Sequence, residues 1–154
     1  KAICRIKHLS YFAIVAAVGN TGVVSSAVSS PPDIQDGDLI RAKGDIDVYI
    51  VKLSDKKQFR RLILNPSVFK NYGHLKWENV KDVGLEIIDL FAISDVVRSV
   101  GDTRVYKLTP SGDIGKKQWV KTADAFSKRG YDWDAVYEIN VFDRNSYTLA
   151  ESLE

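Results

Sequence analysis

The chain has 154 residues, enough for one domain or two small ones. Its 45% hydrophobic and 10% aromatic residues exclude a disordered composition, and a formal charge of +2 is too small to indicate a nucleic-acid partner. Cys4 is the only cysteine, which excludes an intrachain disulfide and a multi-cysteine zinc site. The two histidines, His8 and His74, are too few to indicate a metal centre, so we expect no metal or other cofactor.

The start of the chain differs from the rest. Lys1, Arg5 and Lys7 are the only formal charges before Asp33, and residues 9–32 form an uncharged run about as long as a membrane span. This pattern also describes a secretory signal peptide, with a basic start and an apolar stretch.

We expect residues 1–30 to be a retained apolar segment buried in lipid or against other copies of the chain, followed by a linker at 31–37. Residues 9–18 favour a helix, while the sequence leaves helix, coil and a donated strand open for residues 19–30. The Gly-Asn-Thr-Gly sequence at 19–22 weakens the helix, and the prolines at 31 and 32 end it. A helix that is apolar on all sides must be buried on all sides. The side chains expected to make these assembly contacts are Leu9, Tyr11, Phe12, Ile14, Val15 and Val18.

The remainder contains an internal repeat. Asp38-Leu39-Ile40-Arg41 matches Asp95-Val96-Val97-Arg98, and Val48-Tyr49 matches Val105-Tyr106, both at a spacing of 57 residues. We therefore expect two repeats, residues 38–92 and 93–154. We also align Lys56-Lys57-Gln58-Phe59 with Lys116-Lys117-Gln118-Trp119, which makes the second hairpin three residues longer than the first.

Each repeat is predicted to be a β-hairpin, a short helix and a closing strand, which together give an α+β fold. Alternating β-branched and aromatic residues at 47–53 and 104–108 favour strands. Asn65 and Thr122 are placed to cap the start of a helix, and Pro66 suits its first position. Gly73 and Gly130 follow eight residues after these caps and suit a left-handed helix end.

The motif Phe-x-x-x-Gly, followed by Trp and Val, occurs once in each repeat. We expect its aromatic and glycine positions to form the repeat core, because two units of this size need to share a core. These core residues are Phe69, Gly73 and Trp77 in the first copy and Phe126, Gly130 and Trp133 in the second. An alternative is that Trp77, Trp119 and Trp133 form a platform on which sugars stack.

Basic residues accompany the second strand of each predicted hairpin. They could be a solvated strand face that protects a sheet edge, or a patch that binds an anionic wall polymer. The residues of this possible patch are Lys56, Lys57, Arg60, Arg61, Lys116, Lys117 and Lys121. Because the chain has no GxSxG, HExxH, P-loop or GxGxxG motif, we do not expect an enzyme.

The second copy, with Lys-Lys-Gln-Trp and Phe-x-x-x-Gly-Tyr-Asp-Trp, resembles a tandem repeat of secreted and envelope-attached bacterial proteins. That resemblance covers roughly residues 37–149 and implies an adhesive or structural module without an activity. The apolar segment in front of an exposed module also resembles a type IV pilin-like subunit, in which the N-terminal helix packs in the filament core.

The sequence thus predicts a subunit of an extracellular, pilus-like filament whose repeats are exposed on the outside. Its partners would be copies of itself in a helical polymer, with a membrane involved during export or as an anchor. The alternative is a membrane-tethered or secreted cell-surface module that binds wall glycan or another anionic polymer. Both hypotheses place the protein outside the cell.

If residues 1–30 drive assembly, Ile14→Asp should abolish filaments, because each subunit would have to desolvate a charge at a cost of several kcal/mol. Electron microscopy of the purified wild-type and variant proteins measures this. Filaments that form normally with Asp at position 14 would exclude this segment as the polymerising core.

Overall fold

The structure is a computed structural model that describes residues 33–154. The predicted assembly residues, Leu9 to Val18, and the start of the predicted linker lie outside the described residues. Residues 33–37 of the predicted linker contain no helix or strand and contact the first unit. Gly37 N donates to Val51 O at 2.9 Å, and Ile34 packs against the first sheet.

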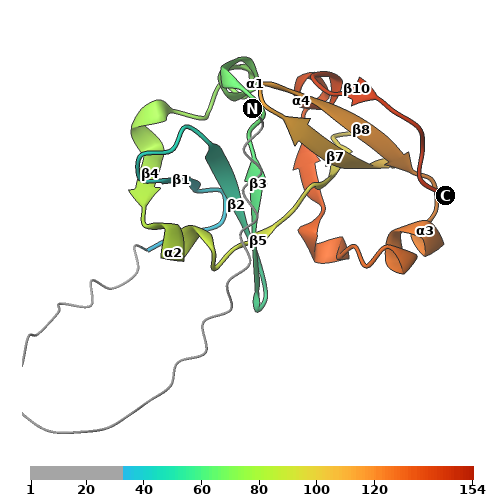
Figure 1. Cartoon of the computed structure of the whole chain (residues 1–154), viewed down its shortest axis with the longest axis horizontal. Coiled ribbons are helices and arrows are strands. Elements are labelled where there is room, and N and C mark those ends of the chain that lie inside the picture. The colour runs from blue at the N-terminus through green and yellow to red at the C-terminus, as the bar shows by residue number, and fades with distance from the viewer. Residues whose placement is uncertain (1–32) are drawn as a thin grey trace, which may run out of the picture. The chain divides into compact units, whose positions relative to one another are not determined.

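The described chain forms two similar units, each with one five-stranded sheet (Figure 1). The strand order is β4-β1-β2-β3-β5 in the first sheet and β9-β6-β7-β8-β10 in the second, which is the same arrangement of equivalent strands. In each sheet three consecutive strands are antiparallel, and the two edge strands run parallel to their neighbours. The predicted α+β class and the internal repeat are thereby confirmed.

The bounds of the elements follow the repeat. The first unit contains β1 (Leu39–Ala42), β2 (Val48–Ser54), β3 (Lys57–Leu62), α1 (Pro66–Asn71), the 3-10 helix η1 (Trp77–Asn79), β4 (Val80–Val83), α2 (Leu85–Ile88) and β5 (Ala92–Ile93). The second unit contains β6 (Val96–Ser99), β7 (Val105–Ser111), β8 (Ile114–Val120), α3 (Ala123–Lys128), the 3-10 helix η2 (Trp133–Ala135), β9 (Tyr137–Ile139), α4 (Val141–Asn145) and β10 (Thr148–Leu149).

The two hairpins have the same length, so the predicted three-residue insertion is wrong. Tyr49 pairs with Leu62, and the equivalent Tyr106 pairs with Trp119. The structural counterpart of Phe59 is therefore Lys116 and not Trp119. Strand register is fixed by which side chains face the core, and the exposed lysines of the matched Lys-Lys-Gln stretches do not constrain it.

The short helices after the hairpins form as predicted. Asn65 Oδ1 accepts a hydrogen bond from Val68 N at 3.0 Å, and Thr122 Oγ1 accepts one from Ala125 N at 3.0 Å. Each helix is followed by a glycine with positive φ, 68° at Gly73 and 71° at Gly130, which reverses the chain.

A first strand (β1 and β6), a second helix and a short edge strand complete each unit, and the sequence analysis missed all three. In each unit a basic side chain of the third strand binds carbonyls at the end of this helix. Arg60 donates to Ile88 O, and Lys117 Nζ donates to Arg144 O at 2.7 Å. The predicted boundary between residues 92 and 93 lies within β5, because β5 belongs to the first sheet.

The two units share one hydrophobic core, as the small size of each unit predicted. This core joins Phe59, Val68 and Phe69 of the first unit to Val97, Phe126 and Tyr137 of the second. A smaller cluster around Ile40, Val51 and Phe91 involves the first unit alone.

The contact between the units is head-to-tail: the β2–β3 and α1 side of the first unit meets the η2, β9 and α4 side of the second. At its centre Arg61 Nη2 lies 2.8 Å from Asp143 Oδ2, and both side chains are buried. Tyr72 donates a hydrogen bond of 2.6 Å to the same carboxylate oxygen. Towards the edge, Lys57 Nζ lies 2.7 Å from Asp132 Oδ2 and 2.7 Å from Asp134 Oδ2.

Asp143→Ala should lower the free energy of unfolding by about 3–5 kcal/mol, because Arg61 would remain buried without its counter-charge. Urea denaturation measures the change. The control is Asp124→Ala, which removes the exposed pair with Lys128 and should cost less than about 0.5 kcal/mol. A loss below about 1 kcal/mol for Asp143→Ala would contradict a central role for this ion pair.

Candidate binding pockets

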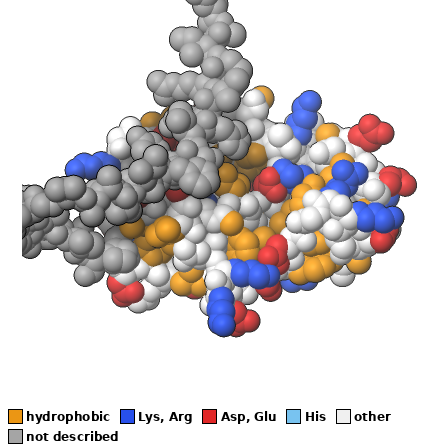
Figure 2. Space-filling view, turned by 60° about the horizontal axis from the view of Figure 1, so that its bottom comes forward, with side chains coloured by type: hydrophobic (Ala, Val, Ile, Leu, Met, Phe, Trp, Pro, Cys, Tyr) orange, Lys and Arg blue, Asp and Glu red, His pale blue; other side chains and the backbone are white. Residues whose placement is uncertain are grey.

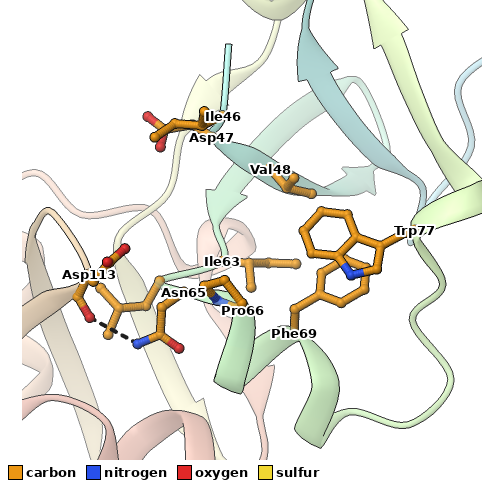
Figure 3. A pocket seen from close by; sticks show the side chains of 10 residues that line it. Ile46, Asp47, Val48, Ile63, Asn65, Pro66, Phe69, Trp77 and Asp113 are labelled. Atoms are coloured by element: carbon orange, nitrogen blue, oxygen red, sulfur yellow. Dashed lines mark hydrogen bonds between the residues drawn. The ribbon is translucent and has the colours of Figure 1, made fainter.

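The first unit has a small pocket with a tryptophan wall (Figure 3). Trp77 stacks on Phe69 with ring centroids 4.1 Å apart and an interplanar angle of 14°. Phe69 is buried, whereas 52% of Trp77 is exposed, so one indole face is covered and the remainder is accessible. The cavity measures about 130 Å³ and is lined by Ile46, Asp47, Val48, Ile63, Leu64, Asn65, Pro66, Phe69, Trp77 and Asp113.

Local sequence explains how this wall forms. The Asn65 cap and Pro66 start α1 so that Phe69 faces the core. The left-handed residue Gly73 then turns the chain back, and η1 presents Trp77 over the phenyl ring of Phe69. An indole has a large apolar surface and one N–H donor, which suits a position that is part buried and part wet.

The far end of the pocket is completed by the second unit. Asn65 Nδ2 donates a hydrogen bond of 2.9 Å to Asp113 O, at the turn of the β7–β8 hairpin. Figure 3 shows Asp47 and Asp113 at one end of the pocket and the Trp77–Phe69 stack at the other. The pocket therefore depends on how the two units are joined.

The second unit has a pocket at the equivalent place. Trp133 stacks on Phe126 with centroids 3.8 Å apart and an angle of 22°, and Trp133 is 53% exposed. The cavity measures about 230 Å³ and is lined by Arg98, Thr103, Arg104, Val105, Trp119, Val120, Lys121, Thr122, Ala123, Phe126 and Trp133. The same arrangement has thus formed twice from different surrounding residues.

Electrostatics differ between the two pockets. Burial raises the pKa of Asp47 in the first pocket, and the nearby charge of Asp45 adds to this effect. In the second pocket Arg104 pairs with Asp102 at 2.9 Å. The hydrogen bonds from Arg104 lower the pKa of Asp102 to about 2, and the charges of Arg104 and Arg144 act in the same direction.

The prediction that Trp77 and Trp133 belong to the core needs correction. They fold back over the short helices as expected, but about half of each remains exposed because it covers the edge of the core. The partners Phe69 and Phe126 are the buried members. The three tryptophans also do not make one platform, since Trp77 lines the first pocket while Trp119 and Trp133 line the second.

The predicted basic patch does not exist as a continuous surface. Arg60 and Arg61 are buried and bind within the fold, and Lys117 binds the main-chain carbonyls of Arg144 and Tyr147. Lys57 is paired with Asp132 and Asp134 of the second unit and so contributes to the contact between the units.

The other predicted patch residues are exposed and separate. Lys121 pairs with Glu154 and lines the second pocket, while Lys56 and Lys116 are exposed without an ion pair among residues 33–154. The spacing of these lysines and arginines along the chain could not distinguish strand positions that face the core from those that face solvent.

Sequence reasoning missed the polar residues of the pockets. Asp47, Arg104 and Asp113 were not singled out, although Asp47 and Arg104 occupy equivalent positions 57 residues apart. The replacement of an aspartate by an arginine at this repeat position was the sequence feature that could have pointed to these residues. No group of three His, Cys, Asp or Glu side chains suited to a metal occurs within residues 33–154, and no helix there is long and apolar enough to cross a membrane.

Trp133→Ala should cost about 2 kcal/mol of folding stability, since its half-exposed side chain loses part of its burial and one aromatic stack. Phe126→Ala should cost more, about 3–5 kcal/mol, as expected for a fully buried aromatic ring. Thermal or urea unfolding compares the two variants. The reverse order would show that Trp133 is the main core residue of the pair.

Comparison with protein-family models, with curated proteins and with solved structures gave no match to this chain. Any functional inference therefore rests on the residues and the geometry described above.

Proposed function

We propose that residues 33–154 are a non-catalytic tandem binding module of a cell-surface protein, which holds a glycan chain through its two tryptophan pockets. The observation that carries this proposal is the repeated, half-exposed tryptophan stacked on a buried phenylalanine beside a cavity. In both units the accessible part of the indole lies beside a cavity, where it can also contact a ligand.

The chemistry of the pockets suits a sugar ring. One indole face offers a flat apolar surface to the C–H groups of a pyranose, while polar groups at the rim can bind its hydroxyls. Such rim groups are the carboxylate of Asp47 in the first pocket and the hydroxyls of Thr103 and Thr122 in the second. Cavities of about 130 and 230 Å³ suit a single sugar ring in each pocket.

Two pockets on one chain favour a polymer over a single sugar. When the first pocket holds one part of a polymer, the second pocket meets another part at a high effective concentration. Modest affinity at each pocket can then give strong overall binding. This reasoning agrees with the alternative hypothesis from the sequence, a cell-surface module for wall glycan.

The surface charge argues against a general polyanion binder. Figure 2 shows Lys and Arg side chains mixed with Asp and Glu side chains over one face, with hydrophobic groups between them. Most basic residues of the predicted patch are buried or paired with carboxylates. A nucleic acid would instead require a continuous basic surface.

A pilus-like filament subunit remains a second proposal, and the apolar run before Pro31 favours it. The two proposals are compatible, because a binding module can be displayed along a filament. They are tested separately, since the described residues carry the pockets and the apolar run would carry assembly.

The double variant Trp77→Ala, Trp133→Ala should lose at least about tenfold in affinity for an immobilised wall glycan, since stacking on both pockets is removed. Each single variant should lose less because one pocket remains. Co-sedimentation with purified cell-wall material measures the binding. The matched control is Phe142→Ala, a partly exposed aromatic in α4 outside both pockets, which should bind as the wild type does.

Melting curves must first show that the variants are folded at the temperature of the assay. Wild-type binding by the folded double variant would contradict the proposed role of the tryptophans. So would an absence of binding by the wild-type protein to any polymeric glycan.

A further inference from the structure

The two pockets share an aromatic wall but differ in charge at the same place. Asp47, at the start of the second strand of the first unit, occupies the position that Arg104 holds in the second unit. Leu64 of the first pocket is likewise replaced by Lys121 in the second. The second pocket also contains Trp119, but an added aromatic ring does not distinguish charged from uncharged ligands as the difference in charge does.

The first pocket contains negative charge without a compensating cation. Asp47 and Asp113 both line it, and neither forms an ion pair with any residue from 33 to 154. Its lining includes no lysine or arginine. Asp45 lies two residues before Asp47 and adds to the negative potential there.

The second pocket is different because its basic groups are already paired. Arg98 lies 3.2 Å from Glu138, Arg104 lies 2.9 Å from Asp102, and Lys121 contacts Glu154. None of these three carboxylates lines the pocket itself. The lining of the second pocket thus offers a cationic ligand no carboxylate, in contrast to the first pocket.

We propose that the first pocket recognises a protonated amino sugar, that is, a hexosamine unit whose amine is not acetylated. This inference rests on the proposed function and names the ligand group for one of its two sites. The sugar ring would lie on the open face of Trp77, and its ammonium group would be attracted by the carboxylates of Asp47 and Asp113. The tryptophan contributes as well, because an indole face attracts a nearby cation. An acetylated amine has no charge and would lose this attraction.

The proposal requires a pocket assembled from both units. Asp47 comes from the first unit, and Asp113 comes from the hairpin turn of the second, which the Asn65 hydrogen bond holds in place. The second pocket has no such neighbour. Selectivity for the amine is thus expected only at the first pocket.

The test compares a hexamer of glucosamine with a hexamer of N-acetylglucosamine by isothermal titration calorimetry at about pH 6. The measurements use the full chain with Trp133→Ala, so that the first pocket dominates binding. We expect the amine form to bind roughly tenfold more tightly, as for a close, partly screened charge pair. Asp47→Asn with Asp113→Asn should reduce this preference to about twofold or less, because the amides lack the negative charge but can still hydrogen-bond sugar hydroxyls.

Two controls show whether the effect belongs to the carboxylates. Asp124→Asn, which changes an exposed carboxylate outside both pockets, should leave the preference unchanged. Lowering the pH to about 4 should weaken the preference, because the raised pKa of Asp47 means that its negative charge is lost at a higher pH than for an ordinary aspartate.

The outcomes separate this inference from the proposed function. Equal or tighter binding of the acetylated hexamer, or a preference that survives both Asn substitutions, would overturn the inference while leaving a glycan-binding role intact. If neither hexamer binds the wild-type chain, and no other polymeric glycan does, both proposals fail.

Discussion

The buried ion pair between Arg61 and Asp143 is the contact on which the arrangement of the two units depends. Two charges taken out of water are costly unless they meet each other with good geometry. Here the 2.8 Å contact and the hydroxyl of Tyr72 satisfy one carboxylate oxygen, while the ring of Tyr137 lies 5.8 Å from the guanidinium carbon. Tyr147 adjoins this region, and burial raises its pKa to about 12, with the charge of Asp143 adding to the rise. Together the ion pair and the Tyr72 hydrogen bond tie α4 of the second unit to β3 and to the end of α1 of the first.

Because the units are placed in this way, the β7–β8 turn of the second unit forms one end of the first pocket. The β7–β8 turn reaches Asn65 because the Arg61–Asp143 contact holds the second unit against α1 and β3. Asn65 thereby has two structural roles: its Oδ1 caps α1 and its Nδ2 binds the main chain of Asp113. The helix that supports the Phe69–Trp77 stack and the acidic end of the cavity are therefore connected through one side chain.

The sequence predicted the local elements well where backbone chemistry determines them. Asn65, Thr122, Gly73 and Gly130 have the roles that their capping and left-handed preferences indicated. The sequence prediction failed where the location of a side chain depends on strand register. The Lys-Lys-Gln match misaligned the hairpins because residues near a turn can be alike without being equivalent. Arg60 and Arg61 were counted among possible surface charges because their spacing does not show which face of the strand is buried. The short second helices were missed because four or five residues carry too little periodicity to be recognised.

The head-to-tail contact has a further consequence for how many units can be joined. A contact between two different faces can in principle be repeated without end, since each added unit offers the face that the next one needs. The present sequence does not repeat its charges in this way. Where Arg61 stands in the first unit, the second has Gln118, and where Asp143 stands in the second unit, the first has Ile87. A further copy of the pair docking in the same way would therefore place Ile87 against Gln118, a contact without the buried ion pair. In a chain of such modules, buried charges would hold the contact within each pair but not the contacts between pairs.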